Sequence, residues 1–210
     1  MQKKDHSKKT KQKTDPDLKI LAIILSGGAG SRVGGVDKGL QVFKSKTLIE
    51  HTISSIEPQV DDIIICINRN ETEYNKLGHT LVFDKQTDYQ GPLAGVSAAH
   101  EWLKTSSQTY DYILISSCDS PLLPPDYVGK LLCVLEDGDK PCAVVNDGER
   151  TQNLHCLIRY DALTSLVKFF DNGGRAMHRW HKKIGLSEVD FSDQADCFSN
   201  FNFSEQLANS

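Results

Sequence analysis

Several features that would place this 210-residue chain in a special class are missing from its sequence. Positive charge is not in excess: 24 Lys and Arg stand against 28 Asp and Glu, and the net charge of −4 argues against general nucleic-acid binding, which normally needs a basic face. No apolar run approaches the ~20 residues of a membrane-spanning helix, and the run at residues 20–25 is shorter than the ~7–15 residues of a secretion-signal core. We therefore expect a soluble, cytoplasmic protein that binds neither nucleic acid nor a membrane.

The six cysteines include no Cys-x-x-Cys pair, and most of them lie in apolar stretches. Thiols in such stretches are expected to be buried and reduced, so the cysteines give no indication of an oxidising compartment. A zinc site made from His155 and Cys156 would need further ligands that no spacing in the sequence supplies.

The length of the chain favours a single domain, since most domains have roughly 100–200 residues. Residues 1–17 hold six lysines and almost no apolar side chain, so we expect a disordered basic tail there and a single domain over residues 18–210. A contact of this tail with a polyanion or a partner is the alternative to a simply solvated tail.

The domain alternates short apolar runs with helical patterns. Strands are predicted at residues 19–25, 62–67, 81–83, 112–116 and 143–145, with a further strand at 154–159. Helices are predicted at 47–57, 92–104, 125–135 and 161–170, and another opens within 173–180. This alternation predicts an α/β fold: a doubly wound, mostly parallel, Rossmann-like sheet with helices on both faces.

A glycine-rich loop follows the first predicted strand and also carries two cations, Arg32 and Lys38. Its glycines allow backbone N–H groups to approach an oligophosphate closely. The loop is not the dinucleotide fingerprint, because Val33 stands where the third glycine is needed, and not a P-loop, because Val36 and Asp37 stand where Lys and Ser or Thr are needed. A flexible surface loop is the alternative, but the preceding strand and the cations favour phosphate binding.

Polar residues follow each of the next predicted strands in the same way. Asn68 and Arg69 follow the second strand, Asp84 follows the third and Asp119 the fourth. Parallel strands present their carboxyl ends at one edge of the sheet, which is where ligands bind in such folds. We therefore expect these clusters and the glycine-rich loop to share one rim.

Five motifs in this order resemble the molybdenum cofactor guanylyltransferase family. They are the loop Leu25-Ser-Gly-Gly with Arg32 and Gly34-Gly-Val-Asp-Lys38, Gln90-Gly-Pro-Leu-Ala-Gly95, Cys118-Asp-Ser-Pro-Leu-Leu-Pro124, Asp147-Gly-Glu-Arg150 and Phe198-Ser-Asn-Phe-Asn202. The resemblance covers nearly the whole chain apart from the tail. It implies transfer of GMP from GTP to the phosphate of molybdopterin or its molybdenum form, with Mg²⁺ as cofactor and molybdenum-cofactor delivery and insertion proteins as partners.

The resemblance also implies which residues form the site. The catalytic residues would be Arg32, Lys38 and Asp119, with Asp119 as the Mg²⁺ ligand. GTP would be bound by Leu25, Ser26, Gly27, Lys38, Cys66, Asp84 and Asp119, and the additional candidates are Gly28, Asn68, Gly91, Gly95, Arg175, Asn200 and Asn202. Two positions depart from the family pattern: Cys66 replaces a common asparagine, which leaves a backbone contact there, and Ser26 replaces a more usual alanine.

Some of these residues have simpler explanations. Asp119 precedes a serine and a proline, so it could be a turn or helix-cap residue. Asn200 and Asn202 would point to one face if they lay on a strand, or could form a turn before a C-terminal helix near Ser204. A set of basic residues in the second half of the chain could bind the pterin phosphate, or could simply form a solvated basic helix face. These residues are Arg150, Arg175, His178, Arg179, His181 and Lys182.

Other reactions fit part of the pattern. A related nucleotidyltransferase that joins another NTP to a sugar or alcohol phosphate would share the loop and the metal-binding aspartate. A non-catalytic regulator that binds a nucleotide is a third possibility, although nucleotide binding without catalysis would not need both Lys38 and Asp119.

Overall fold

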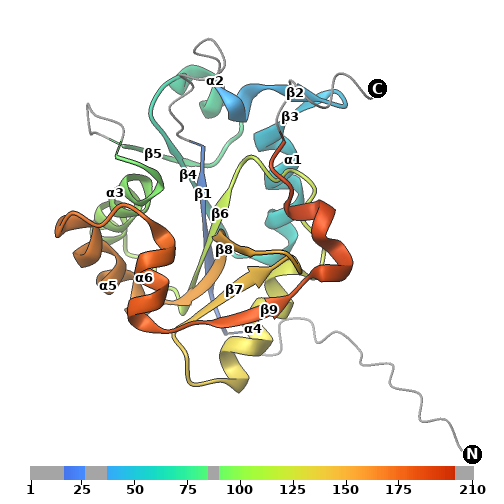
Figure 1. Cartoon of the computed structure of the whole chain (residues 1–210). Coiled ribbons are helices and arrows are strands. Elements are labelled where there is room, and N and C mark those ends of the chain that lie inside the picture. The colour runs from blue at the N-terminus through green and yellow to red at the C-terminus, as the bar shows by residue number, and fades with distance from the viewer. Residues whose placement is uncertain (1–16, 27–36, 85–89, 202–210) are drawn as a thin grey trace, which may run out of the picture.

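The computed structural model describes residues 17–26, 37–84 and 90–201, and in these ranges the chain forms one seven-stranded sheet (Figure 1). The strand order is β5-β4-β1-β6-β8-β7-β9. The strands are β1 (Ile20–Leu25), β4 (Asp62–Ile67), β5 (Thr80–Phe83), β6 (Tyr112–Ser117), β7 (Cys142–Asn146), β8 (Thr151–Arg159) and β9 (Ser187–Asp190). The helices are α1 (Leu48–Ile56), α2 (Glu71–Asn75), α3 (Pro92–Thr105), α4 (Tyr127–Asp137), α5 (Tyr160–Asp171) and α6 (Met177–Ile184).

Six of these strands run in the same direction. β1 pairs in parallel with β4 and β6, β4 with β5, and β7 with β9, whereas β8 is antiparallel to both of its neighbours, β6 and β7. Only a few residues separate β7 from β8, and so short a connection can join only antiparallel strands. The predicted α/β fold with a mostly parallel sheet is confirmed, and the strand predicted at 154–159 is the antiparallel one.

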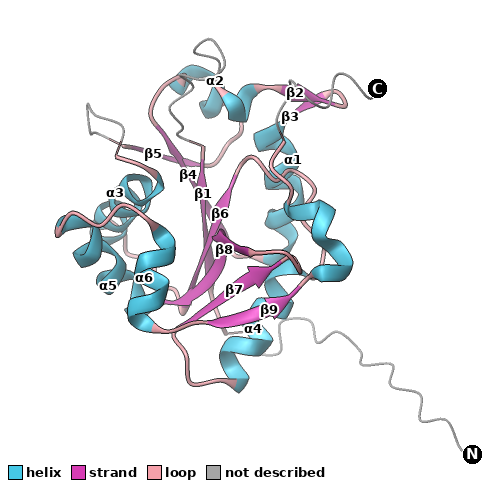
Figure 2. Cartoon of the chain, in the orientation of Figure 1, coloured by secondary structure: helices cyan, strands magenta, loops and turns pink. Residues whose placement is uncertain are grey.

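Helices cover both faces of the sheet. Figure 2 shows α1 and α4 on one side and α3, α5 and α6 on the other. Each side has its own apolar core, and β1 is buried along its whole length because it lies inside the sheet with both faces covered. Burial of each such aliphatic side chain stabilises the fold by roughly 1.5–3 kcal/mol.

The helix boundaries follow from local chemistry. Thr47 and Glu50 form a reciprocal capping box that starts α1, and Pro92 occupies the first turn of α3 after Gly91, whose φ of 82° suits glycine. The helix predicted within 173–180 begins only at Met177. The elements that were not predicted from the sequence are α2, β9, the hairpin of β2 (Val42–Phe43) and β3 (Lys46–Thr47), and the 3₁₀ turns η2 (Lys38–Leu40), η3 (Glu57–Gln59) and η4 (Ser192–Phe198). Among the described helices, none has both the length and the apolar character needed to cross a membrane.

Candidate active site

The carboxyl ends of the parallel strands form one rim. The backbone N–H of Ser26 donates to the carbonyl of Cys66 at 2.9 Å, and that of Cys118 donates to the carbonyl of Leu25 at 3.2 Å. Asp84 N–H donates to the carbonyl of Ile67 at 3.0 Å. These bonds join the segments that leave β1, β4, β5 and β6, so the predicted convergence is confirmed for the described residues.

At this rim Lys38 meets Asp119. Lys38 lies in η2 and Asp119 follows β6, and Lys38 Nζ donates to Asp119 Oδ2 at 3.0 Å. Ser117 Oγ donates to the other carboxylate oxygen, Oδ1, at 2.6 Å. The two side chains are 34% and 21% exposed, which leaves part of the pair open to a ligand.

The surroundings of Asp119 keep its carboxylate ionised. Burial by itself would raise the pKa of Asp119, but the nearby Lys38 ammonium and the hydrogen bond from Ser117 outweigh it, and the pKa is lowered. The rim therefore holds a charged pair whose negative member can attract a cation and whose positive member can attract phosphate oxygens.

A buried carboxylate, Asp37, anchors the segment that carries Lys38. It is 7% exposed and accepts hydrogen bonds from Tyr74 Oη at 2.9 Å, from Gly39 N at 3.1 Å and from Asn70 Nδ2 at 3.0 Å. Arg69 Nε lies 3.9 Å from its Oδ2. This network was not predicted, because Asp37 had no assigned role within the motif and no pattern in the sequence singled out Tyr74.

The same network reaches the end of β1. Because Tyr74 Oη donates its proton to Asp37, Ser26 Oγ is the donor to Tyr74 Oη at 2.6 Å, and Ser26 Oγ also lies 3.4 Å from Cys118 Sγ. Gly39 packs against this group so closely that a Cβ there would overlap Ser26 Oγ and Tyr74 Oη. The serine that departs from the family pattern therefore has a defined role in linking β1, α2 and the β6 loop.

Three residues predicted to bind GTP and two of the additional candidates lie together beside α3. Leu25, Cys66, Asp84, Gly91 and Gly95 line one small hollow at the ends of β1 and β4. α3 approaches closely here: a Cβ on Gly95 would lie 3.0 Å from Leu25 Cδ2 and 3.1 Å from Cys66 Cβ. The Cys66 thiol is buried, its pKa is raised by that burial, and it donates to the Gly95 carbonyl at 3.2 Å, so its hydrogen is already used within the protein.

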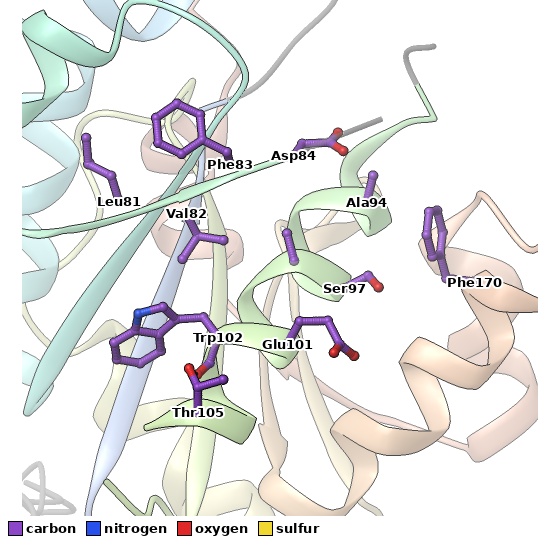
Figure 3. A pocket seen from close by; sticks show the side chains of 11 residues that line it. Leu81, Val82, Phe83, Asp84, Ala94, Ser97, Glu101, Trp102, Thr105 and Phe170 are labelled. Atoms are coloured by element: carbon purple, nitrogen blue, oxygen red, sulfur yellow. The ribbon is translucent and has the colours of Figure 1, made fainter. Parts of the chain in front are cut away.

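A larger groove of about 610 Å³ continues from this hollow between β5 and α3 (Figure 3). Asp84 lies at one end of the groove, Trp102 and Thr105 lie toward the other, and Phe170 of α5 stands across from α3. Asp84 lines both spaces and thereby connects the groove to the rim.

Arg175 lies close to the Gln90-Gly91 segment. Its Nη2 donates to Gln90 Oε1 at 2.7 Å, and its Nη1 donates to the carbonyls of Phe170 and Gly174 at 2.8 Å each. Its guanidinium also lies over the Phe170 ring, 4.5 Å from the centroid. Arg175 therefore holds the segment before α3 against the end of α5.

The C-terminal motif approaches Asp119 through its backbone. Phe201 N–H donates to the carbonyl of Asp119 at 2.9 Å, and the Phe201 ring lies 4.3 Å from that of Phe43, measured between centroids. Residues 199–201 form no strand, so the strand geometry considered for the asparagines does not apply to Asn200, which is exposed. Asn68 is likewise exposed after β4.

Some predicted site residues lie outside the described ranges. They are Gly27, Gly28, Arg32 and Asn202, together with the rest of the glycine-rich loop.

Known proteins match the chain over nearly its whole length. Residues 22–184 match the family model described as MobA-like NTP transferase domain. The molybdenum cofactor guanylyltransferase of Shewanella sp. (strain ANA-3) is 41% identical over 189 residues, which cover 90% of this chain and 93% of the relative, and that of Shewanella woodyi is 40% identical over 90% and 94%. The solved structure of molybdopterin-guanine dinucleotide biosynthesis protein A from Archaeoglobus fulgidus superposes with a TM-score of 0.69 at 18% identity, covering 90% of this chain and 95% of that one.

Proposed function

The chain belongs to the molybdenum cofactor guanylyltransferases, enzymes with a MobA-like NTP transferase domain, and from this premise we propose how its rim residues carry out the reaction. The enzyme transfers GMP from GTP to the phosphate of molybdopterin or its molybdenum form, and molybdopterin guanine dinucleotide and pyrophosphate are the products. The observation that carries the assignment of residues is the Lys38–Asp119 pair at the carboxyl ends of β1 and β6.

The reaction is a displacement at phosphorus. An oxygen of the pterin phosphate forms a bond to the α-phosphorus of GTP, and the bond from that phosphorus to the oxygen bridging the α- and β-phosphates breaks. The phosphate nucleophile is already anionic, so no side chain has to remove a proton from it. The protein's contribution is then alignment of the two phosphates and cancellation of their charge.

Lys38 supplies positive charge for this purpose, and Arg32 of the glycine-rich loop is proposed to supply more. Lys38 is held in place by Asp119 and by the anchoring of its neighbour Asp37, so its ammonium is positioned before the substrate binds. Preorganised charge of this kind stabilises the transition state without reorganisation during the reaction.

Asp119 fits the ligand requirements of Mg²⁺. It is ionised and partly exposed at the rim, and Mg²⁺ usually binds to one or two carboxylates together with substrate phosphate oxygens. When bound, Mg²⁺ would neutralise charge on the triphosphate and its leaving group. Asp119 would hold the ion, and Ser117 would keep the carboxylate in its orientation through the bond to Oδ1.

The small hollow beside α3 has a volume of only about 10 Å³, so the guanine base is proposed to bind over its mouth, next to Asp84. The carboxylate of Asp84 can accept hydrogen bonds from the ring N–H and the amino group of guanine, and backbone groups of Leu25, Ser26, Gly27 and Cys66 complete the contacts. The Cys66 side chain is already bonded to Gly95, which supports a backbone role at that position. Arg175 is proposed to lie on the pterin side of the rim, and Asn200 is proposed to complete the metal or phosphate shell.

The assignment is tested with GTP labelled at the α-phosphate, Mg²⁺ and purified molybdopterin. We expect the label to move to the dinucleotide with release of an equal amount of pyrophosphate. Transfer to a sugar phosphate in place of molybdopterin, or equal use of CTP, would instead support the related nucleotidyltransferase. Delivery and insertion proteins that receive the product are proposed partners, to be sought by co-purification with the product-loaded enzyme.

A further inference from the structure

Two thiols and an imidazole meet in the core behind the active-site rim. Cys142 of β7, Cys156 of β8 and His181 of α6 place their sulfur and ring-nitrogen atoms within 4.8 Å of one another. All three residues are buried, with exposed fractions of 0%, 0% and 1%. None of them takes part in the proposed transfer of GMP.

The histidine is oriented as metal ligands usually are. His181 Nδ1 lies 3.0 Å from Asn153 Oδ1, a pure acceptor, so Nδ1 carries the proton and donates it. Nε2 is then left with a free lone pair, and this buried atom has no hydrogen-bond partner among the described residues. An outer amide or carboxylate oxygen that fixes the tautomer in this way is the common arrangement around metal-binding histidines.

Ordinary core packing does not account for that nitrogen. A buried polar atom without a partner destabilises the folded state, and an apolar side chain in the same place would avoid that loss.

We propose that Cys142, Cys156 and His181 bind a zinc ion through two sulfurs and Nε2. Thiolates and imidazole are the ligands that zinc prefers. Among the described residues, the cluster includes no carboxylate, the ligand that would favour Mg²⁺ or Ca²⁺. Binding replaces the thiol protons with the metal, so up to two protons are released per ion. Three side-chain ligands leave the fourth position of a tetrahedral ion to a water molecule or another small ligand.

The ion would join three elements that are distant in sequence. It would connect the antiparallel strand β8, its neighbour β7 and the helix α6, which carries the exposed basic residues His178 and Arg179. The zinc site would thereby fix α6 against the sheet. Because its ligands are buried, the ion would enter as the chain folds, so it has to be supplied during folding.

The full chain is refolded with zinc, dialysed against metal-free buffer and analysed for bound metal. We expect about one zinc ion per chain in the wild type and in the control Cys133→Ser, whose thiol is exposed, and near-complete loss in the double variant Cys142→Ser/Cys156→Ser. Asp119→Ala should retain its zinc, which separates this site from the proposed Mg²⁺ site. Zinc retention by the double variant, or its absence from the wild type, would overturn the proposal.

A second measurement needs no variant and so does not depend on how the double variant folds. Refolding the wild type with cobalt should give a thiolate-to-cobalt charge-transfer band in the near ultraviolet, because two sulfurs bind the ion. Bound cobalt without that band would place the ion on oxygen or nitrogen ligands and would contradict the assignment.

Discussion

Lys38 and Asp119 are 81 positions apart in the chain, yet Lys38 Nζ and Asp119 Oδ2 are separated by only 3.0 Å. The contact exists because β1 and β6 are parallel neighbours, so the segments that follow them leave the sheet at the same edge. It places one positive and one negative group at the rim before any substrate arrives.

Removing either member of this pair should impair catalysis strongly. Lys38→Ala or Asp119→Ala should lower the rate of GMP transfer at least ~100-fold, which is the usual loss when a preorganised charge stabiliser is removed. Steady-state kinetics of the folded variants with GTP, Mg²⁺ and molybdopterin provide the measurement. Lys76→Ala is the matched control, since the Lys76 side chain forms an exposed pair with Glu73, and its rate should match the wild type. Near-normal rates for both rim variants would contradict the proposed roles.

The hydrogen bond from Tyr74 to Asp37 should matter for activity as well as for stability. Tyr74→Phe removes the donor to the buried Asp37 carboxylate and the partner of Ser26 Oγ, so we expect a loss of about 1–3 kcal/mol in the free energy of unfolding, together with slower transfer. Urea unfolding and the transfer assay measure the two effects.

Tyr110→Phe is the matched control for Tyr74. Its hydroxyl donates to Asp62 at 2.9 Å at the other end of the sheet, so this variant should lose stability while its transfer rate stays normal. Equal transfer rates in the two variants would show that the Asp37 network does not position Lys38.

The Cys66 side chain should contribute little to GTP binding. Because its thiol already donates to the Gly95 carbonyl, Cys66→Ala should leave the KM for GTP within about threefold of the wild type. Asp84→Ala should raise that KM by about tenfold or more, since it removes charged hydrogen bonds to the base. If Cys66→Ala raised the KM for GTP more than Asp84→Ala did, the proposal that the Asp84 carboxylate recognises guanine would be wrong.

Stability at acid pH should report on the hairpin between β7 and β8. Asp147 Oδ1 accepts hydrogen bonds from the backbone N–H groups of Glu149 and Arg150 at 2.9 and 2.7 Å. Burial would raise the pKa of Asp147, but these bonds outweigh it, and the pKa is lowered. The Asp147 carboxylate thus binds a proton less readily in the native state than in the unfolded state. Its contribution to the free energy of unfolding is complete well above the unfolded pKa of about 3.9, and this contribution is lost as the pH falls below that value.

Asp147→Asn should therefore cost about 2 kcal/mol at pH 7 and clearly less at pH 3, as measured by urea unfolding. Asp139→Asn is the control, because the Asp139 side chain is exposed and its contact with Lys140 should contribute little. A loss in Asp147→Asn that does not change with pH would contradict this explanation.

The sequence predicted the parallel strands and the rim because their signals are local. Apolar runs mark β1, β4, β5 and β6, and each is followed by polar residues or glycines, so parallel pairing brings the segments that carry Lys38, Asp84 and Asp119 to one edge. The short elements were missed for the opposite reason. β2 and β3 have two residues each, and α2 has five, which is too few for a period of 2 or 3.6 to be recognised.

The buried networks depend on tertiary contacts that no spacing reveals. Tyr74 contacts Asp37 only because α2 folds over the end of β1, and His181 meets Cys142 and Cys156 only because α6 packs on the hairpin. Asn200 shows the limit of a local pattern: alternation with phenylalanine is typical of a strand, but the segment runs beside Asp119 through a backbone bond from Phe201 instead.

The central claim is that the triphosphate binds at this rim, and the most direct test is a crystal structure of the chain with Mg²⁺ and a non-hydrolysable GTP analogue. We expect the α-phosphate to contact the Lys38 ammonium, with the metal held between Asp119 and phosphate oxygens. A nucleotide whose phosphates lie at another edge of the sheet, away from both side chains, would contradict the account.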